Sequence, residues 1–391
     1  MASSEIAIDP PSRRFHPILV GLGAWTDHLH FGYDAVAALR PRTLVELGTD
    51  RGESYFCFCQ AVVENNTGTH CFAVDNWRGD LHVGGYDEAT YHQVAKHNEE
   101  NYSDFSTLVR SDFDEALGRF EENSIDLLHL DGLHTEAAVR QDLARWLPKL
   151  RPGSILLMHD VAVRKRGFGV WKVWEELCTR GRSFTFADGP GLGLWEKPPA
   201  ATQPAPIETF LSGPNEQTEQ LLSDYRIQSA NVHQRIARSW SNGTISDTYF
   251  AQQTTIQVFF STDGVHREEN SVLARIGHGE FRDLTLPLPP GGHRAVRIDF
   301  VSAFTTIDLE AIRLRLADGS VLFEASTPET FGAMRITGDA LRLSHPTCLR
   351  IKVTGIDPQI YLPHLLSDTQ SHESVSAELH LRVHAPGVIP P

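Results

Sequence analysis

The chain has 391 residues, of which 41% are hydrophobic, and its net charge is −15 at pH 7. This length suggests about two or three domains, and the negative charge argues against a nucleic-acid partner, because phosphate backbones attract basic surfaces. No apolar run reaches about 18 residues, so no membrane span is expected, and the first residues do not resemble a secretory signal. Five cysteines without a Cys-x-x-Cys pair indicate reduced thiols, as in a cytoplasmic protein.

Strand-like and helical segments alternate through the first half of the chain. The predicted strands lie at residues 43–48, 70–75, 106–110, 125–131, 154–159, 183–187 and 193–196. The predicted helices lie at residues 53–65, 87–101, 112–120, 135–147 and 168–180. Strands separated by such helices predict a mostly parallel sheet with helices on both faces. The last two strands flank a turn containing glycine and proline, so we expect a hairpin that gives the seven-stranded sheet an antiparallel edge.

The first of these strands ends in a glycine turn, Leu-Val-Glu-Leu-Gly-Thr-Asp-Arg-Gly at residues 44–52. Glycines at such a position allow the backbone to turn sharply and to approach a ligand closely. A turn of this kind, at the carboxyl end of a parallel strand, is where open α/β sheets bind nucleotide-like molecules. Glycine turns without any ligand are also common, so the neighbouring residues decide the interpretation.

The second half of the chain has a different pattern. A Pro/Ala-rich segment at residues 197–206 marks a domain boundary. The helix expected at about 215–239 has a short apolar seam, which fits either a coiled-coil pair or a lone helix packed on its own chain. From about residue 245, short segments alternate between apolar and polar residues, which predicts a β-sandwich. We therefore predict an α/β domain at 1–197, a proline-rich linker and helix at 198–243, and an accessory β-sandwich at 244–391.

Residues at the ends of the second and third strands are placed to contact a nucleotide-like ligand. Asp75 follows the glycine turn at a spacing that suits hydrogen bonds from a ribose diol, although an aspartate at a strand end also caps turns. Trp77 would cover an adenine face. Ser111 and Asp112 end the third strand, where an adenine amino group would lie, and Asp112 serves equally well as the N-cap of the next helix.

Acidic and imidazole side chains stand at the ends of the fourth and fifth strands. Asp131 and His134 follow the fourth strand, and His159 and Asp160 follow the fifth. Adjacent parallel strands bring such ends together, so we expect a cluster that faces the glycine turn. Oxygen ligands with one imidazole suit Mg²⁺ or Mn²⁺. Alternatively, His134 would be a general base, because the pKa of a histidine lies near working pH.

Taken together, residues 44–197 resemble class I S-adenosylmethionine-dependent methyltransferases, which implies a Rossmann-like methyltransferase domain. The resemblance is greatest to the subgroup of macrocin-type sugar O-methyltransferases and of methyltransferases found with bacterial polysaccharide genes. It rests on Val-Glu-Leu-Gly-Thr-Asp-Arg-Gly-Glu-Ser at 45–54 and Leu-Asp-Gly-Leu-His-Thr-Glu-Ala-Ala-Val at 130–139. Shorter matching segments lie at 146–153, 159–160, 168–171 and 174–177. The resemblance covers about half of the chain.

This resemblance implies a role for individual side chains. The residues that would bind S-adenosylmethionine are Glu46, Gly48, Thr49, Gly52, Asp75, Trp77, Ser111 and Asp112. Asp131 would be a catalytic residue and a metal ligand, with His159 and Asp160 as the other ligands. His134 would be the catalytic base. Two positions depart from the family pattern, since Asp50 replaces a glycine and His159 replaces an acid of the metal-dependent members.

We therefore expect a cytoplasmic O-methyltransferase that acts on a sugar hydroxyl of a glycan or glycosylated metabolite, with Mg²⁺ or Mn²⁺ as an optional cofactor. The expected partner is a sugar or glycan acceptor, and a homo-oligomer is one option. Two alternatives are an enzyme of the cephalosporin-hydroxylase type on the same scaffold and a non-catalytic carbohydrate-binding protein. Every candidate catalytic residue precedes the proline-rich segment, so the sandwich is not expected to take part in methyl transfer itself.

Overall fold

The structure, a computed structural model, divides the chain into two units, Met1–Ile236 and Ala237–Pro391. It describes residues 9–20, 24–80, 84–85, 88–164, 167–241, 253–261, 263–267, 270–277, 279–288, 295–301, 305–363 and 374–384. The domain limits predicted at residues 197 and 243 stay a prediction, and residues 242–243 of the predicted linker lie outside the described residues.

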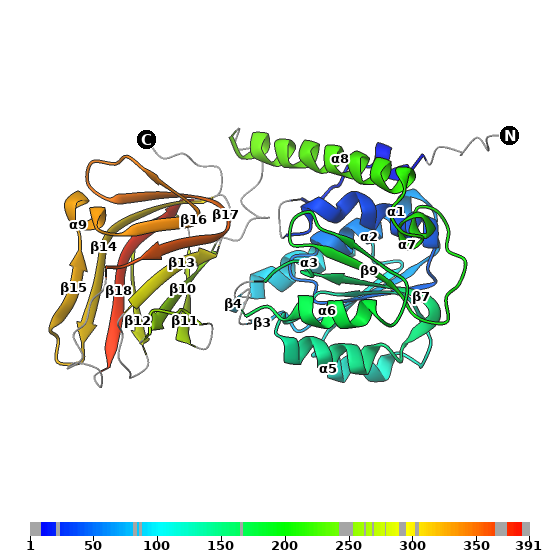
Figure 1. The fold of residues 1–391 in the computed structure, drawn as a ribbon, viewed down its shortest axis with the longest axis horizontal. Coiled ribbons are helices and arrows are strands. Elements are labelled where there is room, and N and C mark those ends of the chain that lie inside the picture. Colours follow the sequence, from blue (N-terminus) through cyan, green and yellow to red (C-terminus); the bar gives the residue numbers. More distant parts are fainter. Residues whose placement is uncertain are drawn as a thin grey trace. The chain divides into compact units, whose positions relative to one another are not determined.

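A seven-stranded sheet forms the centre of the first unit (Figure 1). Its strands are β1 (Thr43–Leu47), β2 (His70–Asp75), β5 (Ser106–Arg110), β6 (Ile125–Leu130), β7 (Leu150–His159), β8 (Ser183–Phe186) and β9 (Leu192–Glu196). They follow the order β5-β2-β1-β6-β7-β9-β8, and the neighbouring pairs from β5 to β7 are parallel. β9 runs antiparallel to both β7 and β8. The predicted Rossmann-like sheet with an antiparallel edge is confirmed.

Helices cover both faces of this sheet. They are α1 (Leu29–Leu39), α2 (Glu53–Glu64), α3 (Glu88–Asn101), α4 (Phe113–Ala116), α5 (Glu136–Trp146), α6 (Val170–Cys178), α7 (Ile207–Leu211) and α8 (Glu216–Ser241). Figure 1 shows α5 and α6 on one face and α1 and α2 on the opposite face. Trp146 of α5 and Val173 of α6 pack with Leu128 of β6 in one buried core. The sequence pattern does not predict α1 or α7.

Shorter elements complete the first unit. They are the 3-10 helices η1 (Pro11–Arg14), η2 (Thr26–His28) and η3 (Leu117–Arg119), and a two-stranded ribbon of β3 (Gly79–Asp80) and β4 (Gly84–Gly85). η3 continues α4, so the single helix predicted at 112–120 consists of two short helices. Among the described residues, no helix combines the length and the apolar character needed to cross a membrane.

The segment after β9 packs against the sheet edge. The Gln203 side-chain amide donates to Glu196 at 2.6 Å and to the carbonyl of Gly153 at 2.7 Å. Arg182 at the start of β8 pairs with both Glu196 and Glu208 at 2.7 Å. These contacts hold the proline-rich segment against β8 and β9 and bring α7 and α8 back onto the first unit.

Helix α8 packs on its own chain, which is one of the two arrangements that the sequence allows. Its apolar seam is buried within the first unit and consists of Leu222, Tyr225, Val232 and Ile236. The Tyr225 hydroxyl donates to Asp34 of α1 at 2.9 Å. Ser229, which interrupts the seam, donates to Asp27 at 2.6 Å. The seam therefore closes over α1.

Antiparallel strands around an apolar core make up most of the second unit. They are β10 (Gln253–Ser261), β11 (Ser271–Gly277), β12 (Arg282–Leu288), β13 (Ala295–Val301), β14 (Thr306–Leu316), β15 (Val321–Ala325), β16 (Arg335–Leu343), β17 (Leu349–Tyr361) and β18 (Val375–His384), with the short helix α9 (Pro328–Gly332). All belong to one sheet, because β14 pairs with β17 over its first half and with β15 over its second. The predicted antiparallel β domain is confirmed. Its strands form a single, nearly barrel-like sheet, in which the two layers expected of a sandwich are continuous.

Candidate active site

The glycine turn after β1 is shaped by the backbone at the end of β6. Gly48 has a φ of +88°, and a Cβ atom on it would lie 2.0 Å from the carbonyl oxygen of Asp131. The Gly48 N–H donates to the carbonyl of Val74 at the end of β2, at 3.0 Å. Gly48 is therefore required for the contact between strand ends, whether or not a ligand approaches it.

Two further residues of this turn adopt the left-handed conformation. Gly52 has a φ of +85°, and a Cβ atom there would lie 2.5 Å from the ring of Phe56. Asp50 has a φ of +49°. Aspartate tolerates this conformation better than most residues, which explains how it replaces the glycine of the family pattern.

The Asp75 carboxylate holds the glycine turn in place. It accepts hydrogen bonds from the backbone N–H groups of Thr49 at 2.8 Å, Asp50 at 3.0 Å and Trp77 at 2.7 Å. Burial raises the pKa of Asp75 despite these three donors. Asp75 therefore stands where we expected it, beside the turn, and it supports the turn backbone. Its contact with a ribose stays a prediction.

Trp77 is an internal support of the same turn. Its ring is buried, with 2% of the residue exposed, and its indole N–H donates to the carbonyl of Asp50 at 2.9 Å. Its ring also packs at 5.0 Å from Tyr91 of α3. Trp77 is also among the residues that line the cleft at the ends of β2 and β5, and its contact with an adenine face stays a prediction.

A polar cleft of about 430 Å³ opens between the ends of β2 and β5. Asn76, Arg110, Ser111 and Asp112 are among the residues that line it. The Asn76 amide donates to Asp112 at 2.7 Å, and within the described residues the Asp112 side chain makes no capping bond to α4. Asp112 has two expected roles, a contact with adenine or a cap on α4. Its side chain lines the cleft and does not cap α4 in the described structure, which favours the first role.

Glu46 lies fully buried at the end of β1. One of its carboxylate oxygens contacts His129 Nδ1 at 2.7 Å and accepts a hydrogen bond from the Ser54 hydroxyl at 2.7 Å. The other oxygen has no hydrogen-bond partner in the part of the chain that the structure describes. Burial raises the pKa of Glu46, and His129 opposes this effect. An unpartnered buried carboxylate oxygen needs a donor from a ligand or ordered water.

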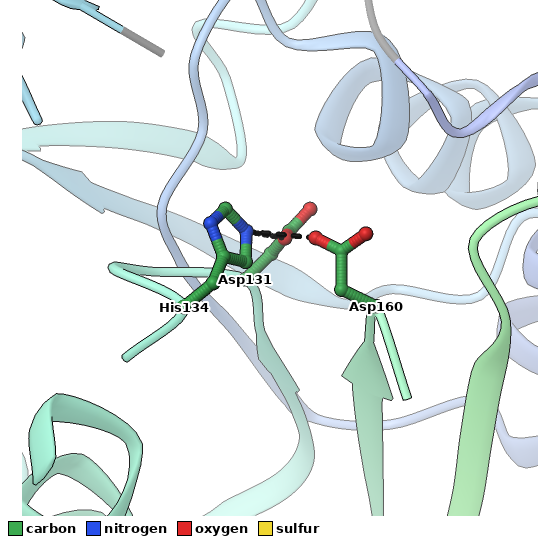
Figure 2. A group of neighbouring side chains, drawn as sticks. All are labelled: Asp131, His134 and Asp160. Atoms are coloured by element: carbon green, nitrogen blue, oxygen red, sulfur yellow. Dashed lines mark ion pairs between the residues drawn. The ribbon is translucent and has the colours of Figure 1, made fainter. Parts of the chain in front are cut away.

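Asp131, His134 and Asp160 converge at the carboxyl ends of β6 and β7 (Figure 2). His134 Nε2 lies 2.7 Å from Asp160 and 3.5 Å from Asp131. The His134 ring stacks on Phe168 at 4.4 Å, which fixes its plane. One ligand atom from each of the three residues lies within 4.8 Å of the others. The predicted convergence of acids and imidazole at these strand ends is present.

His159, the expected third metal ligand, lies behind this cluster. Its Nδ1 atom is 3.3 Å from Asp131 and 3.5 Å from Asp160. His134 takes the place in the group of three ligand atoms that we expected for His159. His159 is thus placed to orient the two carboxylates from the interior side.

The cluster forms two mutually stabilised pairs of charges. Burial works against ionisation of Asp131, but the adjoining His159 and His134 lower its pKa well below the usual value. The same neighbours lower the pKa of Asp160 against the effect of burial. Burial also opposes a charged His134, but Asp160 and Asp131 raise its pKa to about 10. At neutral pH the two carboxylates therefore hold the His134 ring in its protonated form.

A segment before β1 packs against His159 behind the cluster, and sequence reasoning missed it. The Trp25 backbone N–H and the Thr26 hydroxyl donate to Glu53 of α2 at 3.3 and 2.9 Å. The Trp25 ring lies 6.0 Å from His159, and the ring of His28 lies 5.7 Å from it. No spacing or periodicity connects residues 25–28 with strand ends much later in the chain, so the sequence offers no signal for this contact.

Residues 45–161 match the family model of a methyltransferase domain. The matched segment begins in β1 and ends just after β7, so it contains the glycine turn and all of Asp131, His134 and Asp160. Residues 45–161 are therefore similar to a methyltransferase domain, as the sequence predicted.

A similar sequence is that of y4gI, an uncharacterised protein from Sinorhizobium fredii (strain NBRC 101917 / NGR234), which is 51% identical over 176 residues. This match covers 44% of the chain but only 19% of y4gI, so the chain spans about a fifth of the curated relative that it matches.

Two solved methyltransferases resemble the first unit at low sequence identity. A methyltransferase from Geobacter sulfurreducens is 18% identical, with 46% of this chain and 81% of that chain covered and a TM-score of 0.34. The O-methyltransferase TomG from Streptomyces achromogenes, solved in complex with SAM, is 14% identical, with 46% and 82% covered and a TM-score of 0.35. These likenesses are too weak to bear on the activity.

Proposed function

We propose that this protein is an S-adenosylmethionine-dependent O-methyltransferase that acts on a sugar hydroxyl of a glycan or glycosylated metabolite. The observation that carries the proposal is the group of Asp131, His134 and Asp160 within a methyltransferase domain. A hydroxyl is a poor nucleophile until a base removes its proton or a cation lowers its pKa. This group offers side chains for both, beside the glycine turn that abuts Asp131.

Two features of the first unit support S-adenosylmethionine as the methyl donor. The unpartnered oxygen of buried Glu46 suits the ammonium group of a methionine moiety. The cleft of about 430 Å³ beside Ser111 and Asp112 falls in the size range of small-molecule sites, which is about 300–1,000 Å³. When bound, the cofactor supplies an electrophilic methyl group on a sulfonium. The turn residues and Asp75 then position it, which is much of what an in-line displacement requires.

His134 is the proposed general base. Asp160, 2.7 Å from Nε2, fixes the orientation of the ring and stabilises the imidazolium that forms when the acceptor proton is taken. The same carboxylates keep the resting ring protonated, because they raise the pKa of His134 to about 10. His134 must therefore lose a proton before it takes one from the acceptor, and positive charge near the carboxylates favours that loss.

Asp131, His134 and Asp160 also fit a divalent cation. Two carboxylates and one imidazole suit Mg²⁺ or Mn²⁺, and their ligand atoms lie within 4.8 Å of one another. When bound, such a cation lowers the pKa of a coordinated hydroxyl. His134 contacts both carboxylates through Nε2, and one nitrogen cannot be metal ligand and base together. The base role and the ligand role of His134 are thus separate hypotheses.

The sugar acceptor rests on the resemblance of residues 44–197 to macrocin-type and polysaccharide-associated methyltransferases. The second unit is then an accessory domain that holds a glycan chain or builds an oligomer, because every proposed catalytic residue lies in the first unit. All five cysteines are free thiols, which supports a reducing compartment such as the cytoplasm.

A methyl-transfer assay tests this function. The protein is incubated with S-adenosylmethionine labelled on the methyl group and with monosaccharides, oligosaccharides and glycosylated metabolites, and labelled products are identified by mass spectrometry. We expect label on a sugar hydroxyl, formed about 10²–10⁴-fold more slowly by the His134→Ala variant. Absence of S-adenosylmethionine binding in calorimetry would contradict the cofactor, and transfer only to acceptors without sugar would contradict the acceptor class.

A further inference from the structure

We propose that a pocket beside the catalytic cluster binds one sugar ring of the acceptor, so that helix α8 takes part in selecting the substrate. This inference rests on the proposed function. The pocket has a volume of about 160 Å³ and lies between α8, the start of α1 and the turn after β8. A cavity of about 150 Å³ admits benzene, so this pocket has room for one six-membered ring.

The lining of the pocket combines an apolar wall with a polar rim. Phe31, Phe186 and Leu222 supply the wall, and the rings of Phe31 and Phe186 lie 4.2 Å apart. Asp188 and Arg226 stand on the rim. Small-molecule sites commonly have this composition, with an apolar lining and a few polar groups that fix orientation. The apolar face of a pyranose would pack on the aromatic wall, and its hydroxyls would meet the rim.

Polar links between elements hold the pocket open in one shape. Arg226 Nε of α8 donates to both oxygens of Asp188 at 3.0 Å. Asp27 accepts a hydrogen bond from Ser229 at 2.6 Å and pairs with His233 at 2.8 Å. Three elements are thereby fixed before any ligand arrives. Preorganisation of this kind reduces the entropy cost of binding.

Two histidine side chains, His28 and His159, connect the pocket with the catalytic cluster. His28 lines it, is 1% exposed, and its Nε2 atom has no partner among the side chains and backbone that the structure describes. The His28 ring lies 5.7 Å from His159, whose Nδ1 is 3.3 Å from Asp131. The carboxyl end of β7 pairs with the start of β9, so cluster and pocket lie along one edge of the sheet. A ring in the pocket is therefore held near the catalytic cluster, with His28 and His159 between the two.

Every residue that lines the pocket lies outside the segment that matches the methyltransferase family. The transfer machinery is thus inside residues 45–161, whereas the pocket is built by segments particular to this chain. That division suits a site that chooses the acceptor. Two carboxylates, a guanidinium and an imidazole around one rim match the several hydroxyls of a sugar better than the one or two of a phenol.

Saturation-transfer NMR with simple ring compounds tests this site directly. The probes are the methyl glycosides of glucose, galactose, mannose and rhamnose, with catechol as a separate arm, and the full chain is used without cofactor. In Ala230→Trp, an indole on α8 fills the pocket. Gln234→Trp is the matched control, because Gln234 is exposed on the same helix and does not line the pocket. Arg226→Met removes a rim donor at an exposed position.

We expect at least one glycoside to bind, with affinity on the order of tenfold or more lower in Ala230→Trp and unchanged in Gln234→Trp. Arg226→Met should weaken the same glycoside. Absence of glycoside binding, equal binding to Ala230→Trp, or binding of catechol alone would overturn the proposal. Calorimetry with S-adenosylhomocysteine on all variants separates the two proposals. If the wild type binds the glycoside but not this cofactor product, the sugar site stands and the proposed methyltransferase activity fails.

Discussion

The carbonyl oxygen of Asp131 occupies the space that a side chain on Gly48 would fill. A Cβ atom on Gly48 would lie only 2.0 Å from that oxygen. The Asp131 N–H in turn donates to the carbonyl of Leu47 at 2.8 Å. The glycine turn and the acid of the proposed catalytic cluster are thus in direct backbone contact, and a change in one position must move the other.

Replacement of Gly48 should therefore destabilise the first unit. For Gly48→Ala we expect a loss of about 2–5 kcal/mol, from about 1–2 for the left-handed conformation and about 1–3 for overpacking. Gly68→Ala is the matched control, since Gly68 has a φ of +74° and no atom within 4 Å of its Cβ position. Urea unfolding measures both variants, and equal losses would contradict the role assigned to the contact.

Asp75 should matter for cofactor affinity. Asp75→Ala removes the acceptor for three backbone N–H groups, and we expect binding of S-adenosylhomocysteine to weaken by about 1.5–3 kcal/mol in calorimetry. A 2′-deoxy analogue distinguishes two causes. A carboxylate that contacts the ribose diol makes the variant lose less affinity for the analogue, whereas one that only supports the turn makes both losses equal. Unchanged affinity for the parent compound would rule out both roles.

Turnover should depend on the His134 imidazole far more than cofactor affinity does. Loss of a general base typically lowers the rate by about 10²–10⁴-fold, so His134→Ala should fall in that range and bind S-adenosylhomocysteine almost normally. Phe168→Leu keeps the imidazole and removes the stacked ring, and we expect a decrease below about tenfold. Near-normal turnover of His134→Ala would show that another group accepts the proton.

Removal of divalent cations should lower activity, and Mg²⁺ or Mn²⁺ should restore it. Direct Mn²⁺ binding, followed by electron paramagnetic resonance, should weaken at least about tenfold in Asp131→Asn and Asp160→Asn. Glu122→Gln is the control, since Glu122 is an exposed acid paired with Lys149. His134→Gln and His159→Gln then identify the nitrogen ligand. Two results together would exclude a metal site and leave the base hypothesis standing. They are full activity in the presence of the chelator and no Mn²⁺ binding to the metal-free protein after the chelator has been removed.

Asp34 should make stability depend on pH. Burial raises the pKa of Asp34 to about 6, although Ser12 and Tyr225 donate hydrogen bonds to it; an exposed aspartate has a pKa of about 3.9. The stability that Asp34 contributes by binding a proton is thus fully present below about pH 3.9 and is lost as pH rises through about 6. Relative to Asp34→Asn, the wild type should gain up to about 3 kcal/mol between pH 7 and 4. A difference that stays constant in urea unfolding at several pH values would refute this.

The order and type of the seven sheet strands, and of the main helices between them, follow from the sequence alone, whereas α1, α7 and the ribbon of β3 and β4 do not. The predicted strands agree with β1, β2, β5, β6, β8 and β9 to within about a residue, and β7 begins earlier than predicted. These patterns are local, because apolar runs, turn residues and helical spacing are set by neighbours in the chain. The placement of Asp75, Asp131 and Asp160 at one sheet edge also follows, since parallel strands end on the same side.

Only the tertiary structure decides which atoms meet. It assigns three backbone donors to Asp75, places His134 rather than His159 in the group with Asp131 and Asp160, and brings His28 next to His159. It also closes α8 over α1 through Tyr225. These relationships join segments that are far apart in the chain, and their distances depend on how the helices pack on the sheet. Periodicity and spacing along a sequence contain no information about such packing.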